Sequence, residues 1–293
     1  MKGAGIVNFG KVLTAMVTPF DQNNNLDLDK TEQLVNHLIR NGTEGLVIAG
    51  TTGESPTLSK DEKVRLFEKV VEVVAGRVPV IAGTGSNNTA ASIELSKVAE
   101  RSGVDGIMLV APYYNKPNQR GLFEHFKTIA NETTLPVMLY NIPGRSVVNM
   151  SVDTIVELST IDNIVAVKES SGNLDAMAEI IERTSNDFHL YSGDDGLTLP
   201  VLAIGGTGIV SVASHVIGNE MQQMVAAFTS GDNQKAASLH RELLPIMNGL
   251  FMAPSPTPVK HVLNQKGIDV GGVRLPLVPL TDEEVNKLSK LLP

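Results

Sequence analysis

The sequence predicts a (β/α)8 barrel with a helical appendix at its C-terminal end, and three observations lead to this α/β fold class. Eight short apolar runs alternate with longer amphipathic stretches, a pattern typical of parallel strands joined by helical crossovers. The chain has 293 residues, which is normal for a single barrel. No glycine-rich dinucleotide fingerprint follows the first run, and this disfavours an open, doubly wound sheet.

The eight runs are rich in Val, Ile or Leu and are closed by Gly, Pro, Asn or Ser, as expected of strands that are buried on both faces. They predict eight strands in chain order. These strands are Val12–Thr18, Gly45–Gly50, Val78–Gly83, Gly106–Ala111, Leu135–Tyr140, Ile164–Lys168, Phe188–Ser192 and Gly208–Val212.

The stretches between the strands predict the outer helices. Asp61–Ala75 has apolar residues at helical spacing, a capping-box signature at Ser59 and Glu62, and a closing Gly76, which together mark both ends of a helix. Similar patterns predict further helices at Ala90–Ser102, Asp153–Leu158, Asp175–Arg183 and Glu220–Phe228.

The alternation stops near Gly231. Beyond it, three further helices are predicted, and proline-rich connectors join them. These helices are Asn233–Phe251, Pro258–Lys266 and Thr281–Leu292, the last with a capping box at Thr281 and Glu284. We therefore expect a catalytic barrel over residues 1–231 and a three-helix domain over residues 232–293, with no flexible linker between them.

Composition and charge narrow the classes of function. The chain has no cysteine, which removes disulfides, thiolate catalysis and cysteine-ligated metals. A net charge of −8 disfavours nucleic acid as a partner, because phosphate binding needs a basic surface. The six histidines lack the spacing of a metal site. The first ten residues lack the apolar core of a signal peptide, and no run is long enough to span a membrane, so we expect a soluble cytoplasmic protein.

The stretch Ile164–Asn173 is the most informative part of the chain. It combines a buried strand, a lysine at the end of that strand and a polar turn that contains glycine. Burial disfavours the charged form of a lysine, and the neutral amine is the form that attacks carbonyl groups. Lys168 is therefore the candidate nucleophile. The alternative is a lysine that simply reaches solvent where its strand ends.

Other strand ends supply polar groups on the face where barrels carry their active sites. The loop GTTGES (50–55) follows the second strand and offers hydroxyl and backbone N–H donors to an anion. The motif APYYNKP (111–117) follows the fourth strand, and YNIPGR (140–145) the fifth. Tyr140 is suited to proton transfer and Arg145 to holding a carboxylate, although a half-buried tyrosine with a satisfied hydroxyl is the plainer interpretation of each ring.

The ends of the seventh and eighth strands leave two hypotheses open. Asp194 and Asp195 could bind a metal, but capping or turn roles are expected of them. Many barrels bind a substrate phosphate at this place, so an enzyme acting on phosphosugars remains an alternative.

Together, these motifs resemble the dihydrodipicolinate synthase (4-hydroxy-tetrahydrodipicolinate synthase) family, within the superfamily of pyruvate-dependent class I aldolases that includes N-acetylneuraminate lyase. The resemblance extends from Ala15–Pro19 to Arg274–Pro276. Its most specific parts are GTTGES, APYYNKP, YNIPGR and VKESSGN (167–173).

The resemblance implies an activity and an assembly. The activity is Schiff-base condensation of pyruvate with L-aspartate 4-semialdehyde, a lyase step in lysine and diaminopimelate biosynthesis, with no cofactor and no metal. The assembly is a homodimer or homotetramer. The implied catalytic residues are Lys168 as the Schiff base, with Tyr140, Thr51 and Tyr114 as the proton relay, Tyr114 coming from a neighbouring subunit. The implied substrate-binding residues are Thr52, Arg145, Gly193 and Val210.

The chain departs from the family at one place. Members that lysine inhibits carry a histidine and a glutamate at the positions that match Lys63 and Ala91, whereas Ser55, Asn87 and Tyr113 still match that effector pocket. Without the glutamate, the effector's ammonium loses a charge-assisted hydrogen bond. We expect weak or absent inhibition by lysine.

Two further hypotheses remain besides the phosphosugar enzyme. The first is the same pyruvate chemistry on a sugar acid, as in N-acetylneuraminate lyase or the 2-keto-3-deoxy sugar acid aldolases. Arg145 argues against it, because a carboxylate substrate needs a cation where a polyol needs neutral donors. The second is a barrel that only binds a ligand, although such a protein would have no need of a buried amine beside a proton relay.

Overall fold

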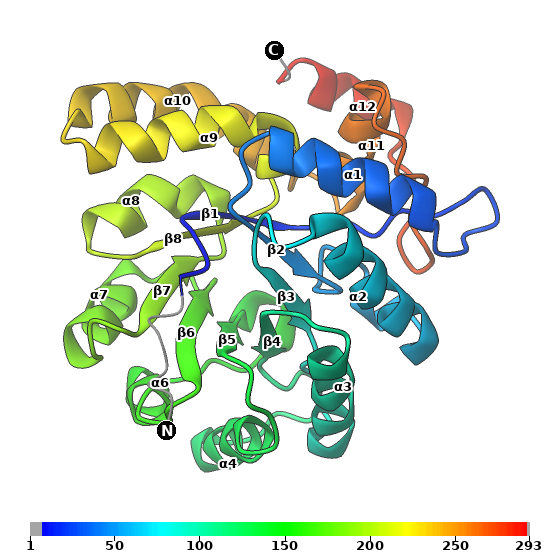
Figure 1. Cartoon of the computed structure of the whole chain (residues 1–293). Helices are drawn as coiled ribbons and strands as arrows, with labels where there is room; N and C mark the ends of the chain where they lie inside the picture. The colour runs from blue at the N-terminus through cyan, green and yellow to red at the C-terminus, as the bar shows by residue number, and fades with distance from the viewer. Residues whose placement is uncertain (1–7, 292–293) are drawn as a thin grey trace.

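A computed structural model of the chain describes residues 8–291 and confirms the barrel. Its eight strands are parallel and pair in chain order, and β8 closes the barrel against β1. Helices surround these strands (Figure 1). The strands are β1 (Val12–Ala15), β2 (Gly45–Ile48), β3 (Val80–Gly83), β4 (Gly106–Val110), β5 (Val137–Asn141), β6 (Ile164–Glu169), β7 (His189–Ser192) and β8 (Gly208–Ser211).

All eight strands lie where the sequence predicts them, but several are shorter. The runs predicted to begin at Val78 and Leu135 begin instead at Val80 and Val137. In each case a proline precedes the first strand residue, and proline has no N–H to give to the ladder. Residues 1–7, where no signal peptide is predicted, lie outside the described part of the chain, as does the predicted helix end at Leu292.

The helices cover the outside of the barrel and continue beyond it. The capping boxes predicted for α2 and α12 are both present. The helices are α1 (Leu28–Arg40), α2 (Lys60–Val74), α3 (Thr89–Arg101), α4 (Gln119–Ala130), α5 (Pro143–Ser146), α6 (Val152–Leu158), α7 (Leu174–Arg183), α8 (Thr198–Ala203), α9 (Ser214–Thr229), α10 (Asn233–Gly249), α11 (Thr257–Gln265) and α12 (Asp282–Ser289), with 3-10 turns η1 (Ser55–Thr57) and η2 (Asp195–Leu197).

Two helix predictions need correction. The helix expected at Glu220–Phe228 begins earlier, at Ser214, because α9 continues across a kink at Ile217, where φ is −130°. The helix expected at Thr281–Leu292 ends at Ser289. The helices α1, α4, α5 and α8 were not predicted. The first of these carries a clear signal, since Asp27 caps it and its buried residues recur at helical spacing.

The barrel interior explains where the reactive side chains lie. Alternate residues of each strand point inward. Together with Phe9, which precedes β1, they form a buried cluster of Leu13, Ala15, Val47, Ile81, Met108, Met138, Tyr140, Ala166, Tyr191 and Val210. Tyr140 is the last inward residue of β5. Lys168 stands two residues after Ala166 on β6, so it faces the same interior near the carboxyl end of the barrel.

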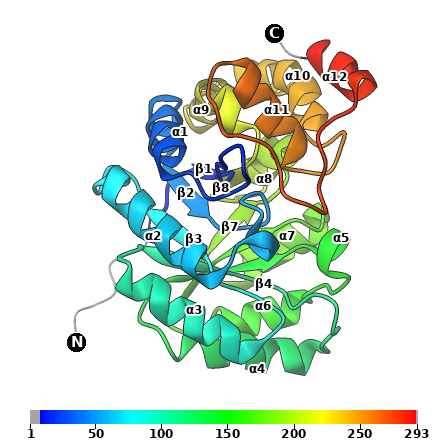
Figure 2. The same cartoon turned by 90° about the vertical axis from the view of Figure 1, so that its right-hand side faces the viewer.

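The C-terminal helices lie together on one side of the barrel, at the top of Figure 2. There α10 packs against α9, and α11 also contacts α9. The division of the chain near residue 231 remains a prediction. Across residues 8–291, the structure contains no helix that is both long and apolar enough to cross a membrane.

Candidate active site

The structure places the predicted nucleophile against the predicted proton-transfer tyrosine. Tyr140 on β5 and Lys168 on β6 are register partners. The Lys168 amine nitrogen is 4.2 Å from the centroid of the Tyr140 ring. Both side chains are buried, with 6% of Lys168 and 4% of Tyr140 exposed. The lysine therefore does not escape to solvent at the end of its strand, and its amine lies on an aromatic face.

The next residue on each of these strands points outward and ties the strands together. The Asn141 amide donates to Glu169 Oε2 at 2.8 Å, and the N–H of Ser171 donates to Glu169 Oε1 at 2.7 Å. Burial raises the pKa of the Glu169 carboxyl, although these hydrogen bonds act in the opposite direction. No role was predicted for this pair from the sequence. Its effect is to fix the strand ends that carry Tyr140 and Lys168.

Gly193, at the end of β7, lies directly against the lysine. A side-chain carbon at this position would be 2.9 Å from Lys168 Cε and 1.8 Å from Ser170 Oγ. The N–H of Gly193 donates to the Glu169 carbonyl at 2.8 Å. Any larger residue would therefore push into the lysine side chain. Val210 on β8 is buried in the barrel interior, as expected for a wall of the site.

The loop after β2 brings two threonines to the same end of the barrel. Thr51 is half-buried and Thr52 is buried. The loop is held from below, because the Thr18 hydroxyl donates to the carbonyl of Gly53 at 2.6 Å. A side chain at Gly53 would come within 3.2 Å of the Ala49 backbone, so the loop packs closely on the strand that precedes it.

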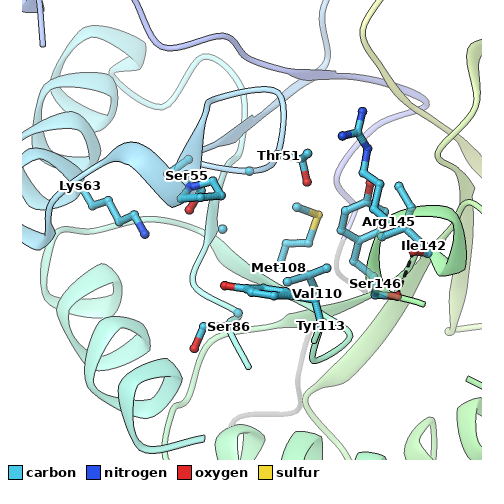
Figure 3. Close-up of a pocket in the computed structure, with 16 residues that line it drawn as sticks. Thr51, Ser55, Lys63, Ser86, Met108, Val110, Tyr113, Ile142, Arg145 and Ser146 are labelled. Carbon is cyan, nitrogen blue, oxygen red and sulfur yellow. Dashed lines mark hydrogen bonds between the residues drawn. The ribbon is translucent and has the colours of Figure 1, made fainter. Parts of the chain in front are cut away.

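A cavity of about 270 Å³ opens above this arrangement. Thr51 lies in its middle, with Lys63 on one side and Arg145 on the other (Figure 3). Of the sixteen residues that line it, two are cations and none is a carboxylate, so it is suited to anionic substrates. They are Ala49, Gly50, Thr51, Ser55, Pro56, Lys63, Gly83, Gly85, Ser86, Met108, Val110, Tyr113, Tyr140, Ile142, Arg145 and Ser146. Lys168 is not among these lining residues, but its amine packs on the ring of Tyr140, which is.

The loop after β4 separates its two tyrosines. Tyr113 lines the cavity, and the Asn87 amide donates to its carbonyl at 3.1 Å. Tyr114 points away, with 89% of its surface exposed. Its φ of +73° lies in a region that non-glycine residues rarely adopt. Within one chain, Thr51 and Tyr140 thus line the cavity and Lys168 packs on the Tyr140 ring, whereas Tyr114 is not among the lining residues.

The paired acids after β7 serve the fold. Asp194 accepts from the N–H of Gly196 at 3.0 Å and so caps η2. Asp195 is buried and accepts from the N–H groups of Val212 and Ala213, at 3.1 and 2.9 Å. Burial raises the pKa of its carboxyl. The capping role expected of this pair is therefore confirmed for Asp194, whereas Asp195 makes a tertiary contact with the residues that precede α9. Within residues 8–291, no group of three or more His, Asp or Glu side chains is placed to hold a metal ion.

The family model and the curated relatives that match this chain point to the same family. Residues 8–293 match the model of the dihydrodipicolinate synthetase family. The 4-hydroxy-tetrahydrodipicolinate synthase 2 of Halalkalibacterium halodurans is 65% identical over 286 residues, which are 98% of each chain. The 4-hydroxy-tetrahydrodipicolinate synthase of Listeria monocytogenes serotype 4a is 60% identical over 288 residues, again 98% of each chain.

Solved structures agree with this result. A dihydrodipicolinate synthase from Bacillus anthracis superposes with a TM-score of 0.96 at 63% identity, over 97% of this chain and 98% of that one. The enzyme from Cyanidioschyzon merolae, solved with lysine bound, gives a TM-score of 0.95 at 46% identity over 97% of each chain. The chain belongs to the dihydrodipicolinate synthetase family.

Proposed function

We propose that Lys168 is the nucleophile of a Schiff-base condensation between pyruvate and L-aspartate 4-semialdehyde. The activity is that of a 4-hydroxy-tetrahydrodipicolinate synthase, the lyase named in the close relatives. This reaction belongs to lysine and diaminopimelate biosynthesis. The observation that carries the assignment of Lys168 is the position of its buried amine, 4.2 Å from the Tyr140 ring centroid at the end of β6.

The chemistry follows from the Lys168 amine acting as a nucleophile. The Lys168 nitrogen adds to the ketone carbon of pyruvate, and loss of water gives an iminium that draws electrons from the adjacent methyl group. Loss of a methyl proton gives the enamine, whose carbon forms a bond to the aldehyde carbon of the semialdehyde. The semialdehyde's own amino group then attacks the iminium carbon, closes the ring and expels the Lys168 amine.

Each proton in this sequence needs a carrier. The Tyr140 hydroxyl and the Thr51 hydroxyl stand on the cavity wall, where they can pass protons to and from the carbinolamine and the new alkoxide. We assign Tyr114 to the same relay, supplied by a neighbouring subunit. Its exposure on the single chain supports that origin. The assembly we infer is therefore at least a homodimer, and a tetramer of two dimers is the fuller form.

The remaining residues hold the substrates. Thr52 and the backbone of its loop hold the pyruvate carboxylate, and Arg145 holds the carboxylate of the semialdehyde, since guanidinium groups bind carboxylates through paired hydrogen bonds. Gly193 leaves room for the imine beside Lys168, and Val210 closes the wall.

We also infer that lysine inhibits this enzyme weakly or not at all. The Cyanidioschyzon merolae relative was solved with lysine bound. In this chain Lys63 extends into the cavity beside Ser55 (Figure 3). Burial lowers the pKa of Lys63, but a lysine there supplies no negative charge in either protonation state, so it cannot form an ion pair with the ammonium of a second lysine.

The direct test is consumption of pyruvate by the purified protein with three separate acceptors: aspartate semialdehyde, N-acetylmannosamine and glyceraldehyde. We expect turnover with the semialdehyde alone, and none in the Lys168→Ala variant. Turnover with a sugar aldehyde in place of the semialdehyde would keep the Schiff base and overturn the acceptor. Undiminished turnover in the variant would overturn the role of Lys168.

A further inference from the structure

A buried ion pair joins the substrate loop to the C-terminal helices, and no step of the reaction above uses it. Glu54 lies in the loop after β2, whereas Lys260 lies on α11. The Lys260 nitrogen is 2.7 Å from Glu54 Oε1, and both side chains are almost completely buried. The other carboxylate oxygen, Oε2, accepts a hydrogen bond of 2.9 Å from the N–H of Arg274. The C-terminal segment thus holds both oxygens of Glu54.

Lys260 is enclosed on several sides. Its nitrogen donates to the carbonyl of Gly272 at 2.6 Å and lies 4.2 Å from the centroid of the Phe20 ring. Burial lowers the pKa of Lys260 to about 8, although the carboxylate of Glu54 acts in the opposite direction. The charge of Lys260 is therefore maintained in the interior by its partner on the loop.

Arg274 makes a second connection to the same loop. Its guanidinium donates to the carbonyl of Thr57 at 2.8 Å and also pairs with Glu62 at the start of α2. This contact lowers the pKa of the Glu62 carboxyl to about 2. Residues after α11 therefore fix the loop at Glu54 and again at Thr57, before α2 begins.

The loop is short and internally bonded, so a movement of Glu54 reaches the threonines. The N–H of Glu54 donates to the carbonyl of Thr51 at 3.0 Å, and the next N–H, that of Ser55, donates to Gly50 at 3.2 Å. Glu54 has a φ of +55°, a conformation that a non-glycine residue keeps only where its surroundings hold it. The ion pair with Lys260 is one of those restraints.

We propose that the Glu54–Lys260 ion pair is a positioning device through which the C-terminal helices set the pyruvate-binding loop that carries Thr51 and Thr52. The proposal rests on the function proposed above, which assigns this loop to pyruvate. A buried ion pair is often no more stabilising than apolar residues of similar size, so stability alone does not explain the charges. Among the described residues that line the substrate cavity, neither Glu54 nor Lys260 appears. Their effect must pass through the loop.

The test compares the parent with the Lys260→Met single variant and the Glu54→Gln/Lys260→Met double variant, all as full-length protein. Three quantities are measured: Tm, the kcat and KM for pyruvate, and the pyruvate dependence of borohydride trapping on the Lys168 amine. Borohydride trapping reports only on folded subunits whose Lys168 can form the imine with pyruvate. In the single variant, a buried carboxylate loses its cation, and we expect a lower Tm.

The double variant separates an effect on the position of the pyruvate-binding loop from an effect on the stability of the fold. With both charges removed, its Tm should return toward that of the parent. Its pyruvate half-saturation should stay raised and its kcat/KM should stay about tenfold to a hundredfold low, the cost of a small misplacement of binding groups. A pair that only stabilises the fold would leave the pyruvate dependence of trapping unchanged.

A matched control breaks an ion pair elsewhere on the C-terminal helices. Lys287 pairs with Glu283 on the exposed face of α12, and Lys287→Met should leave both the Tm and the pyruvate kinetics at parent values. The positioning role would be overturned if the double variant and the parent showed the same dependence of trapping on pyruvate concentration. A parent that traps no pyruvate would instead overturn the proposed function, so the two failures are distinct.

Discussion

The two ends of the proposed proton relay are held in different ways. Lys168 and Tyr140 stand on neighbouring strands, are paired in register, and are 6% and 4% exposed. Tyr114 stands in the loop after β4, is 89% exposed, and has a left-handed backbone with φ +73°. The barrel alone thus determines where the first two side chains lie, whereas the third is exposed on the single chain.

The difference supports the proposal that folding of one chain builds part of the site and that association of subunits completes it. Side chains on barrel strands are placed by the alternation of inward and outward residues, so Lys168 meets Tyr140 as soon as the strands pair. Tyr114 instead lies in a loop and has an exposed ring, which is consistent with the proposed role in a neighbouring subunit. We therefore expect mutations at the strand ends to act on the chemistry in every subunit, and mutations at Tyr114 to act across an interface.

The largest effect is expected at the strand-borne nucleophile. Lys168→Ala removes the only atom that can form the imine, so kcat should fall at least about 10³-fold. Mass spectrometry after borohydride treatment with pyruvate should show an adduct in the parent and none in the variant. We expect little change in Tm. An adduct of normal yield in the variant would mean that another amine carries the reaction.

The next effect is expected at Tyr140. Tyr140→Phe keeps the ring on which the lysine amine packs and removes only the hydroxyl. Loss of a general acid–base group typically lowers the rate about 10²- to 10⁴-fold. We expect a fall of that order in kcat with a nearly unchanged Tm. Trapping of pyruvate at saturation should persist, since the amine remains. A kcat close to that of the parent would remove Tyr140 from the relay.

Tyr114 gives the most direct test of the contrast between strand-borne residues and a residue supplied by a neighbouring subunit. Tyr114→Phe alone should lower kcat about 10²-fold if its hydroxyl relays protons. Mixing this variant with Lys168→Ala and allowing subunits to exchange should restore activity. In the mixed dimer, a site with an intact Lys168 receives an intact Tyr114 from its neighbour. Activity that stays at the sum of the two separate variants after exchange would place Tyr114 outside its neighbour's site.

Much of the fold could be predicted from the sequence, because barrel strands and capped helices carry local signals. The runs of Val, Ile and Leu marked all eight strands, and the serine and threonine capping boxes marked the starts of α2 and α12. The strands that begin at Val80 and Val137 start two residues later than predicted, because a proline precedes each of them. The kink at Ile217 in α9 has no such local signal.

The site was less predictable, because its supports come from distant parts of the chain. The resemblance named Gly193, and the structure adds the reason, a Cβ only 2.9 Å from the Lys168 side chain. Glu54 is part of the motif GTTGES, but no neighbouring residue in the sequence indicated that its partner lies on α11. Glu169 likewise stands within VKESSGN, but that motif does not predict its hydrogen bond with Asn141. In each case the missing information is a tertiary contact.

The smallest effect is expected at the cavity wall far from the lysine nucleophile. Addition of millimolar lysine should change the parent's rate by less than about twofold, because no carboxylate lines the cavity near Lys63 to meet an ammonium. The Lys63→His/Ala91→Glu double variant supplies the histidine and the carboxylate. It should gain inhibition by lysine while keeping its kcat in lysine-free buffer. Ala91 lies exposed in the first turn of α3, where a glutamate is tolerated and favoured by the helix dipole. Strong inhibition of the parent would show that lysine binds here without that carboxylate, and the departure at these two positions would then carry no regulatory meaning.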